Sequence, residues 1–418
     1  MIQKSRLSPS ECLFSQSSLI NDQRTFYYFI LVFSLIFFKI PTMMHFGKKI
    51  SSFTILNSFS KFQFIDTFYF TDWFPYDYHQ DLSSLIKTYS NCPPCNFKSI
   101  VDKPSSTPKD ILLSSMFGDI ANLVPSSRSL RTTGSKATFF ILTENNTYSL
   151  MTPDCIKLIS NCGLFVINLG VCKKLTPREF YAIRHLFYYN FLVPRKHLIH
   201  RIILMDLYDS IFQGDPFPSY FEDDILMFCS ENLTFSRSRG NRKWLRTIVH
   251  DKVIKYYGHH IVNGGTILGT APLIIKYLEL FMIYVNMSRL KLCQADDQAY
   301  TNFFAYSGIL EKHQIKHKVL YLNDFIVCIH GMQHYPGNWI LGKYRTPNSN
   351  QKHLLVHQFD RSKVMKFNVY IACPKMHYNV SHYMRGINDV QYALLDKFVE
   401  NKSFYYEPFI NEGGYYEG

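Results

Sequence analysis

The sequence is poor in charge, and poorer in acids than in bases. Only 18% of its 418 residues are charged, with 32 Asp and Glu against 45 Lys and Arg, whereas 47% are hydrophobic. This balance is typical of a globular protein and excludes a disordered chain. The length corresponds to two or three domains' worth of chain, which is enough for one large α/β core with appendages.

Several site patterns are missing, and each absence excludes a class of function. The ten cysteines, of which Cys92-Pro-Pro-Cys95 is the only close pair, form neither a zinc pattern nor a compact disulfide framework. No Gly-x-Gly-x-x-Gly follows the first expected strand, which argues against a dinucleotide site. The net charge of +13 would suit a polyanion, but the one basic cluster, over 237–255, belongs to no recognised nucleic-acid module with stacking aromatics. We therefore expect no nucleic-acid partner, and a solvated loop is the plainer explanation of the cluster.

The candidate membrane segment is short. The apolar run from Phe26 to Phe38 has thirteen residues between Arg24 and Lys39, against the ~20 that a helical span needs. We predict a hydrophobic anchor or signal segment over 26–40, after an N-terminal tail over 1–25. A cleaved signal peptide and a buried element are the alternatives.

The cysteines and glycosylation sequons leave the compartment open. Five Asn-x-Ser/Thr sequons permit a secretory location without proving it. They lie at Asn145, Asn232, Asn286, Asn379 and Asn401. In an oxidising lumen, Cys155, Cys162 and Cys172 could supply a bridge near the first strands, whereas in a reducing compartment they would be core residues.

Two acids after an apolar run are the most informative feature of the chain. The stretch is His200-Arg-Ile-Ile-Leu-Met-Asp206-Leu-Tyr-Asp209, and its apolar part predicts a strand covered on both faces. Ligands bind open α/β sheets at the carboxyl ends of strands, where Asp206 and Asp209 would lie. Two carboxylates held together repel each other, and a divalent cation with oxygen ligands is the usual solution. The alternative is a strand that ends in a solvated Asp turn.

Around this strand the chain alternates strand and helix patterns. We predict strands at 137–143 and 163–168, then a helix over 176–191 that begins at the N-cap Thr176, then the acidic strand. This alternation is typical of βαβ units, so the predicted fold is α/β with a mainly parallel central sheet. Further strands are predicted within 225–229, 266–268 and 319–322, and a further helix over 272–285.

The acidic stretch continues Ser-Ile-Phe-Gln-Gly-Asp215-Pro-Phe, and the whole string resembles the Asp-x-Asp region of metal-dependent nucleotide-sugar glycosyltransferases of the GT-A, glycogenin-like type. The resemblance implies a Rossmann-like catalytic domain, which we place over 135–365. It also implies that the acids hold Mn²⁺ or Mg²⁺ against the donor diphosphate. Tyr208 stands where the family has its second acid, which leaves open how Asp206 and Asp209 divide between metal and donor. The same spacing argues against a haloacid-dehalogenase-type phosphatase.

Flanking regions complete this division of the chain. Residues 41–134 show little periodicity and many Ser, Pro and Asp breaks, which predicts a stem or accessory region. Residues 366–418 are short of motifs and predict a C-terminal extension.

Two further segments resemble the sugar-binding elements of the same enzymes. Asn263-Gly264-Gly265 is similar to the Asn-x-Gly segment on the acceptor side, although an ordinary turn before a helix would explain it equally. Asp296-Asp297-Gln298, with Asn302, resembles the Asp-Gln…Asn element that reaches the transferred sugar. That resemblance makes Asp297 and Gln298 the catalytic candidates; the alternative is a helix N-terminus where acids are favoured.

Three more residues receive roles from the resemblance. His357, after a short apolar run, matches the late His that completes the metal site, with His330 and His334 as competitors. Arg184, in the helix before the acidic strand, matches a donor contact. Thr143, at the end of the first expected strand, would lie near the nucleotide together with Glu144.

Taken together, the resemblance implies a retaining glycosyltransferase that moves a sugar from a nucleoside diphosphate to a glycan or protein acceptor. It also implies a single-pass membrane protein that faces the Golgi or ER lumen. Two alternatives stay open. A protein of the same fold without catalysis would be a membrane-anchored carbohydrate-binding protein, and the same carboxylates would serve a metal-dependent hydrolase.

Overall fold

The computed structural model describes residues 76–101, 103–118, 120, 122–171, 179–284, 296–332, 340–346 and 351–373. The predicted anchor over 26–40, three of the sequons, Cys172, His334 and most of the predicted extension over 366–418 lie outside the described residues. Among the helices of this part of the chain, none combines the length and the apolar character that a membrane span requires.

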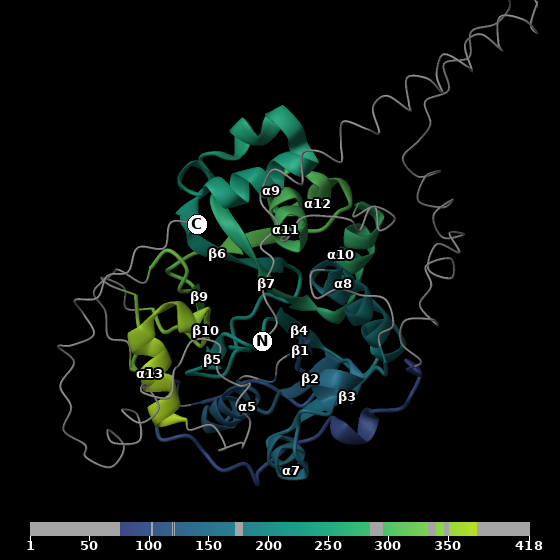
Figure 1. Cartoon of the computed structure of the whole chain (residues 1–418), viewed down its shortest axis with the longest axis vertical. Coiled ribbons are helices and arrows are strands. Elements are labelled where there is room, and N and C mark those ends of the chain that lie inside the picture. Colours follow the sequence, from purple (N-terminus) through teal and green to yellow (C-terminus); the bar gives the residue numbers. More distant parts are fainter. Residues whose placement is uncertain are drawn as a thin grey trace, which may run out of the picture. The chain divides into compact units, whose positions relative to one another are not determined.

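A seven-stranded sheet occupies the centre of the described chain (Figure 1). Its order is β3 (Leu164–Asn168), β2 (Thr138–Thr143), β1 (Ile111–Met116), β4 (Arg201–Met205), β7 (His260–Thr270), β6 (Leu226–Thr234) and β8 (His317–Leu320). Only β7 runs against the others, since it pairs antiparallel with both β4 and β6. The α/β class and the mainly parallel sheet are therefore confirmed, and the arrangement is compatible with a Rossmann-like fold. The carboxyl ends of β1 to β4 meet at one edge of the sheet.

The sheet starts earlier than the sequence predicts. Strand β1 lies inside residues 41–134, which were expected to form a stem, yet it pairs with both β2 and β4. Its sequence Ile-Leu-Leu-Ser-Ser-Met is fully buried, and the two serines hide the apolar run from a reading of periodicity. Ser115 is accommodated because its hydroxyl lies 3.0 Å from the Tyr188 hydroxyl. The domain boundary at residue 135 is therefore wrong.

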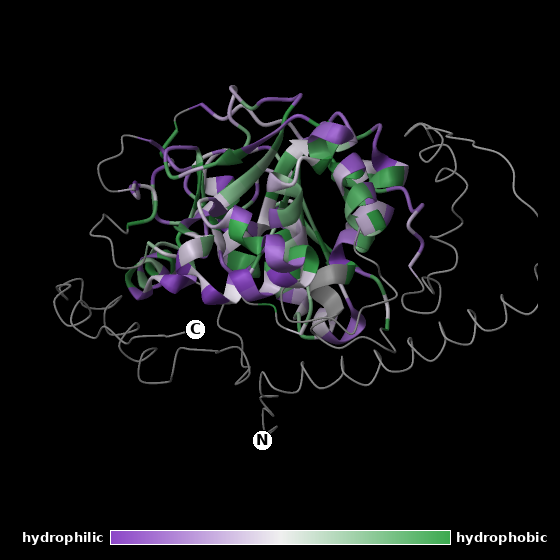
Figure 2. Ribbon diagram, turned by 90° about the horizontal axis from the view of Figure 1, so that it is seen from above, coloured by the Kyte–Doolittle hydropathy of each residue, from purple (hydrophilic) through white to green (hydrophobic). Residues whose placement is uncertain are grey.

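Helices cover both faces of the sheet (Figure 2). One face carries α8 (Glu179–Leu192), α10 (Ala271–Tyr284) and α11 (Asp296–Tyr306), and the other carries α5 (Leu123–Thr132) and α7 (Pro153–Asn161). Short helices α6 (Asn145–Tyr148) and α12 (Ile309–Lys312) complete the connections. The predicted helices over 176–191 and 272–285 are confirmed as α8 and α10 within the described residues.

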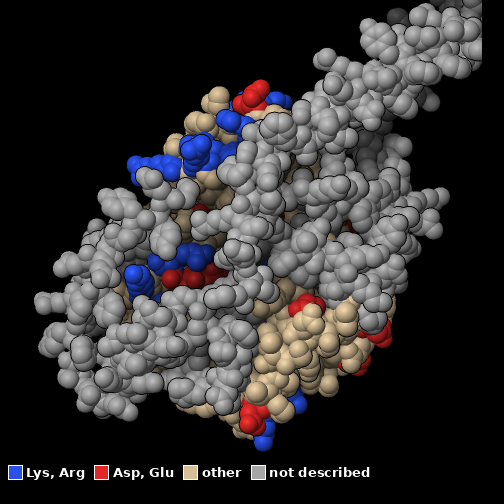
Figure 3. All heavy atoms as spheres, in the orientation of Figure 1, with Lys and Arg blue, Asp and Glu red and all other residues tan. Residues whose placement is uncertain are grey.

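A second layer of structure follows β6. It consists of η3 (Phe235–Arg237), α9 (Arg239–Val249) and η4 (His250–Tyr256), which pack against α11 around their own apolar cluster. Lys and Arg side chains are grouped at this end of the molecule (Figure 3).

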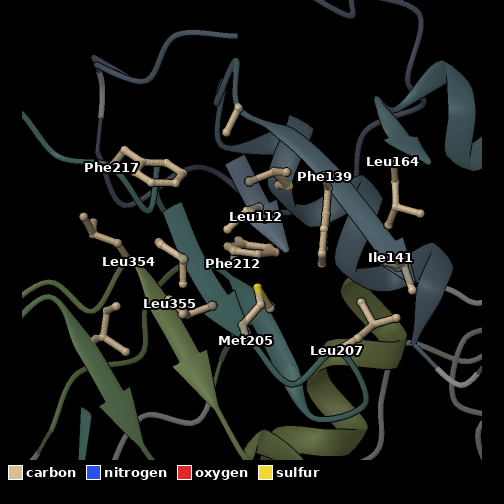
Figure 4. Packing of buried hydrophobic residues seen from close by; sticks show 14 of the residues in the cluster. Leu112, Phe139, Ile141, Leu164, Met205, Leu207, Phe212, Phe217, Leu354 and Leu355 are labelled. Carbon is tan, nitrogen blue, oxygen red and sulfur yellow. The ribbon is translucent and has the colours of Figure 1, made fainter. Parts of the chain in front are cut away.

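A three-stranded sheet brings the C-terminal part of the described chain to the main sheet. Its order is β5 (Ser210–Phe212), β10 (Leu355–His357) and β9 (Ile326–Cys328), with α13 (Lys363–Ala372) behind it. Side chains from both sheets meet in one core, which includes Leu112, Phe139, Phe212 and Leu355 (Figure 4). Because β5 directly follows Asp209, this packing fixes the peptide that carries the second acid.

Two disulfides attach the flanking segments to the domain. Cys92 pairs with Cys162 and Cys95 pairs with Cys373, so the bridge expected among Cys155, Cys162 and Cys172 forms with Cys92 instead. Sequence spacing could not reveal this, because the partners lie 70 and 278 residues apart. The boundary at residue 365 is also wrong, since α13 ends at the Cys373 bridge and packs against η6 (Phe359–Arg361).

The Phe-Gln-x-Asp-Pro-Phe part of the motif has a structural role. The Gln213 amide donates to the backbone carbonyls of Tyr344 and His353 and accepts from the amides of Gly342 and Tyr344. Asp215 Oδ2 accepts from the amides of Ser105 and Ser106 at 2.7 and 2.6 Å. Both buried side chains therefore hold loops whose backbone would otherwise lack partners.

Replacing Asp215 by Ala is expected to lower the free energy of unfolding by about 2–5 kcal/mol, because it leaves two amide N–H groups in the protein interior without acceptors. Chemical denaturation of the full chain measures this change. Asp224→Ala is the matched control, since Asp224 forms only an exposed ion pair with Lys316 and its loss should leave the transition unchanged. Equal losses in the two variants would contradict the role given to Asp215.

Candidate functional site

Asp206 lies at the carboxyl end of β4 and faces away from the main core. Its neighbours Met205 and Leu207 both belong to the core cluster (Figure 4). Alternation along an extended chain therefore turns Asp206 to the opposite face. Its backbone amide donates to the Gly265 carbonyl of β7 at 2.8 Å. The antiparallel strand thus sets the position of the first acid.

The Asp-x-x-Asp spacing places two residues between the acids, and both of them anchor the turn. Leu207 is buried in the core, and the Tyr208 hydroxyl donates to the Phe117 carbonyl just beyond β1 at 3.2 Å. Asp209 then precedes β5, and its own carbonyl accepts from the Phe359 amide at 3.0 Å. Both acids consequently reach the same place despite the departure from Asp-x-Asp spacing.

His357 joins them through the pairing of β10 with β5. In this antiparallel pair His357 lies opposite Ser210, and its Nδ1 is 2.9 Å from the Ser210 hydroxyl. One ligand atom from each of Asp206, Asp209 and His357 lies within 4.8 Å of the others. The predicted grouping of these three residues is confirmed, whereas the competitor His330 lies elsewhere, with Nε2 3.9 Å from Glu231 Oε2.

The electrostatics of this group favour a cation. Burial and the nearby Asp206 raise the pKa of Asp209 well above its usual range. Asp209 Oδ1 is buried with no hydrogen-bond partner among the described residues, although His357 Nδ1 lies 3.3 Å away. Burial lowers the pKa of His357 to about 4, so the imidazole is neutral at neutral pH and able to ligate. These residues fit a metal ion, since two carboxylates and a neutral imidazole could hold one.

Arg184 balances the acids on the other side of Asp206. Its guanidinium contacts Asp206 Oδ1 and donates to Asp297 Oδ2 at 2.6 Å and to the Gly264 carbonyl at 3.3 Å. Burial opposes the charge of Arg184, but Asp206 and Asp297 outweigh it and hold its pKa well above the ordinary value. The same contact lowers the pKa of Asp206 against the effect of burial. In this structure Arg184 is an internal counterion, and its contact with a donor stays a prediction.

Asn263, Gly264 and Gly265 lie inside β7, so the alternative of a turn before a helix is wrong. The two glycines allow close approach on both sides of the strand. A Cβ on Gly264 would lie 3.0 Å from Gln298 Cα, and one on Gly265 would lie 2.3 Å from Asp206 Oδ2. The strand therefore packs directly against the first acid and against the start of α11.

Asn263 and Gln298 meet at a buried acid that the sequence did not reveal as a candidate. Glu231, in β6, accepts from Asn263 Nδ2 at 3.0 Å and from Gln298 Nε2 at 3.3 Å. Gln298 Nε2 also donates to Asn241 Oδ1 of α9 at 2.8 Å. Burial raises the pKa of Glu231, whose Oε2 has no hydrogen-bond partner among the described residues. Its position soon after the apolar run at 225–229 is the signal that could have found it.

The remaining predicted residues lie at the same edge but face backbone groups. The Asn302 side-chain amide accepts from the Val262 N–H and donates to the carbonyls of Val262 and Gln298, so it joins β7 to α11. Thr143 is fully buried and its hydroxyl donates to the Met116 carbonyl. Glu144 caps α6 by accepting from the amide of Thr147.

The site thus combines a group of side chains that could hold a cation with a set of polar side chains beside it. The first contains Asp206, Asp209 and His357, and the second contains Asn263, Asp297, Gln298 and Glu231. Comparison of the chain with models of known protein families, and with curated proteins, found no match.

Proposed function

We propose that the chain is a metal-dependent glycosyltransferase of GT-A architecture that moves a sugar from a nucleoside diphosphate to a glycan or glycoprotein acceptor. The observation that carries this proposal is the convergence of Asp206, Asp209 and His357 at the carboxyl edge of the sheet, within 4.8 Å of one another. Ligands of α/β proteins bind at that edge. Residues far apart in the sequence meet there, and a turn of solvated acids would not need a buried histidine.

The ligand set favours Mn²⁺ over Mg²⁺. Magnesium prefers oxygen ligands, whereas imidazole together with carboxylates suits a transition metal. The ion would be held by Asp206, Asp209 and His357, and it would neutralise the charge that develops on the leaving diphosphate.

The neighbouring side chains suit a sugar. Asn263 and Gln298 carry amides beside the Glu231 carboxylate, and this is the hydrogen-bonding chemistry that hydroxyl groups require. Asp297 is held by Arg184, which keeps it oriented beside Gln298. We assign Asp297 and Gln298 to the reacting sugar, and Asn263, Gly264 and Gly265 to the sugar and its acceptor. Thr143 and Arg184 remain the proposed donor contacts, and stereochemical retention belongs to the same proposal.

The two disulfides support a location in an oxidising compartment, as expected for an enzyme that faces the Golgi or ER lumen. Anchoring through residues 26–40 is part of the proposal.

Turnover of nucleoside diphosphate sugars tests the proposed function. With the full chain and a panel of donors, we expect Mn²⁺-dependent release of nucleotide from one donor and transfer to an acceptor. His357→Ala removes one of three ligands and is expected to weaken Mn²⁺ binding by at least about tenfold. Asp223→Asn, a change at an exposed acid near His200, is the control and should change nothing.

Three results would reject or alter the proposal. Donor hydrolysis without transfer to any acceptor would favour a metal-dependent hydrolase. Metal-dependent donor binding without turnover would favour a carbohydrate-binding protein of the same fold. If neither binding nor turnover depends on metal for any donor, the proposed enzyme is excluded.

A further inference from the structure

The outer face of α9 carries a stripe of cations. Its inner face, formed by Asn241, Leu245 and Val249, is buried. The opposite side bears Arg239, Lys243 and Arg246, all exposed and spaced as neighbours on one side of a helix. The exposed cations of this helix thus lie on the side opposite its buried residues.

The flanking elements η3 and η4 extend the stripe. The exposed cations of the segment define a surface that we call the α9 basic face. It consists of Arg237, Arg239, Lys243, Arg246, Lys252 and Lys255. Asp251 is the only acid between residues 237 and 255, and none of the six cations forms an ion pair with a described residue. The group lies at the end of the molecule that α9 occupies (Figure 3).

This charge distribution works against the helix itself. The first turn of α9 holds Arg239 and no acid, although the positive end of the helix dipole favours acids. Lys243 lies one turn from both Arg239 and Arg246, and like charges at these spacings repel. Such local conflicts are expected at functional positions, and an external anion would relieve them.

The α9 basic face lies next to the candidate site. Asn241, on the inner face of the same helix, accepts from Gln298 Nε2 at 2.8 Å. A helix with its side chains is ~10–12 Å across, so a chain bound along the outer face would lie about that far from Gln298. A bound polymer of several residues would therefore be long enough to contact both the α9 basic face and the candidate site at Gln298.

The small exposed apolar area and the disulfides of the chain indicate which class of polyanion would bind the α9 basic face. Leu245 and Val249 of α9 are buried with Phe235 and Val253, and Trp244 and Ile248 are partly buried. Ile254 is therefore the one large apolar residue of the segment that is exposed, and the exposed apolar area is too small for insertion into a bilayer. The two disulfides are typical of compartments outside the cytosol and nucleus. A carboxylated or sulfated glycan is the polyanion that fits both observations.

We propose that the α9 basic face binds an anionic glycan, and that the acceptor of the enzyme is therefore an acidic chain. The second part of this statement rests on the proposed function, whereas binding itself does not.

Titration of the full chain with a heparin dodecasaccharide, without metal or donor, tests the proposal. We expect binding that weakens as salt rises from about 50 to about 200 mM, and no binding of a neutral dextran oligosaccharide of equal length. The triple variant Arg239→Gln, Lys243→Gln, Arg246→Gln is expected to bind on the order of tenfold more weakly. The control variant Lys109→Gln, Lys136→Gln, Lys157→Gln loses the same charge from exposed positions. Lys157 is on α7, at the end of the molecule opposite α9 (Figure 1). The control should therefore bind like the unmodified chain.

Three outcomes would overturn the proposal. The first is that the unmodified chain fails to bind the dodecasaccharide, and the second is that the two triple variants lose affinity equally. The third is that the chain binds phosphatidylserine vesicles or single-stranded DNA more tightly than it binds the glycan. Thermal unfolding of the control variant should match that of the unmodified chain, because its three substituted residues are exposed, and the α9 variant should unfold at the same or a slightly higher temperature, because it loses the like charges that repel along the helix. Since the titration contains no donor, a failed transferase assay leaves its result unchanged.

Discussion

Asp209→Asn is expected to abolish Mn²⁺ binding and turnover while making the metal-free protein more stable at neutral pH. Loss of a metal ligand removes several kcal/mol of transition-state stabilisation, which is on the order of 10³-fold in rate. The gain in stability has a separate cause. Asp209 is buried, its Oδ1 has no hydrogen-bond partner among the described residues, and burial beside Asp206 raises its pKa well above the usual range. A neutral amide of the same shape removes this penalty, which is about 1–3 kcal/mol.

The pH dependence gives this prediction its sign. A carboxyl group whose pKa is raised by folding stabilises the protein below its unfolded pKa of about 3.9, and that contribution is lost as pH rises through the raised folded-state pKa. The metal-free protein should therefore lose stability over this window, and Asp209→Asn should lose less. Thermal unfolding of both proteins between acidic and neutral pH, with a chelator present, measures the difference.

Added Mn²⁺ should reverse the order of stability, because binding to the folded chain alone stabilises the unmodified protein and not the variant. If Asp209→Asn unfolds at a lower temperature than the unmodified chain without metal, the carboxylate makes a stabilising contact and the account given for it is wrong.

The sequence predicted the centre of the sheet well, because long apolar runs that alternate with helices leave few other folds. It missed β1, where Ser114 and Ser115 interrupt the apolar pattern although both are buried. The first strand of the sheet was therefore predicted too late in the chain. Burial of two small polar residues is a property of their neighbours and cannot be read from the strand alone.

The candidate site likewise contains residues that local sequence predicts and residues that only tertiary contacts bring into place. Asp206 and Asp209 follow from local sequence, since an acid directly after a buried strand lies at the ligand edge. His357 reaches them only because β10 pairs with β5, and no local pattern specifies a pairing between Ser210 and a residue 147 positions away. The Glu231 position depends likewise on tertiary contacts with Asn263 and Gln298. The identity of the ion stays a prediction.

Gly265→Ala should damage the site as severely as loss of a metal ligand. A Cβ at this position would lie 2.3 Å from Asp206 Oδ2 and 2.9 Å from Asn263 Oδ1. Neither group can retreat easily, because Arg184 holds Asp206 and the Gly265 amide itself donates to Asn263 Oδ1 at 2.7 Å. We expect the added methyl to displace Asp206, to weaken Mn²⁺ binding by at least about tenfold, and to lower the free energy of unfolding by about 1–3 kcal/mol.

Gly269→Ala in the same strand separates this steric effect from the general effect of replacing a strand glycine. A Cβ on Gly269 would meet Leu226 Cδ1 and Leu273 Cβ at 3.5 Å, which is ordinary van der Waals contact with apolar atoms. That variant should retain Mn²⁺ affinity and stability, as measured by isothermal titration and by chemical denaturation. If both variants bind Mn²⁺ like the unmodified chain, Asp206 is free to move or does not ligate the ion. The metal group would then have to be rebuilt around Asp209 and His357, because these two owe their positions to β5 and β10 and not to the strand that contains Gly265.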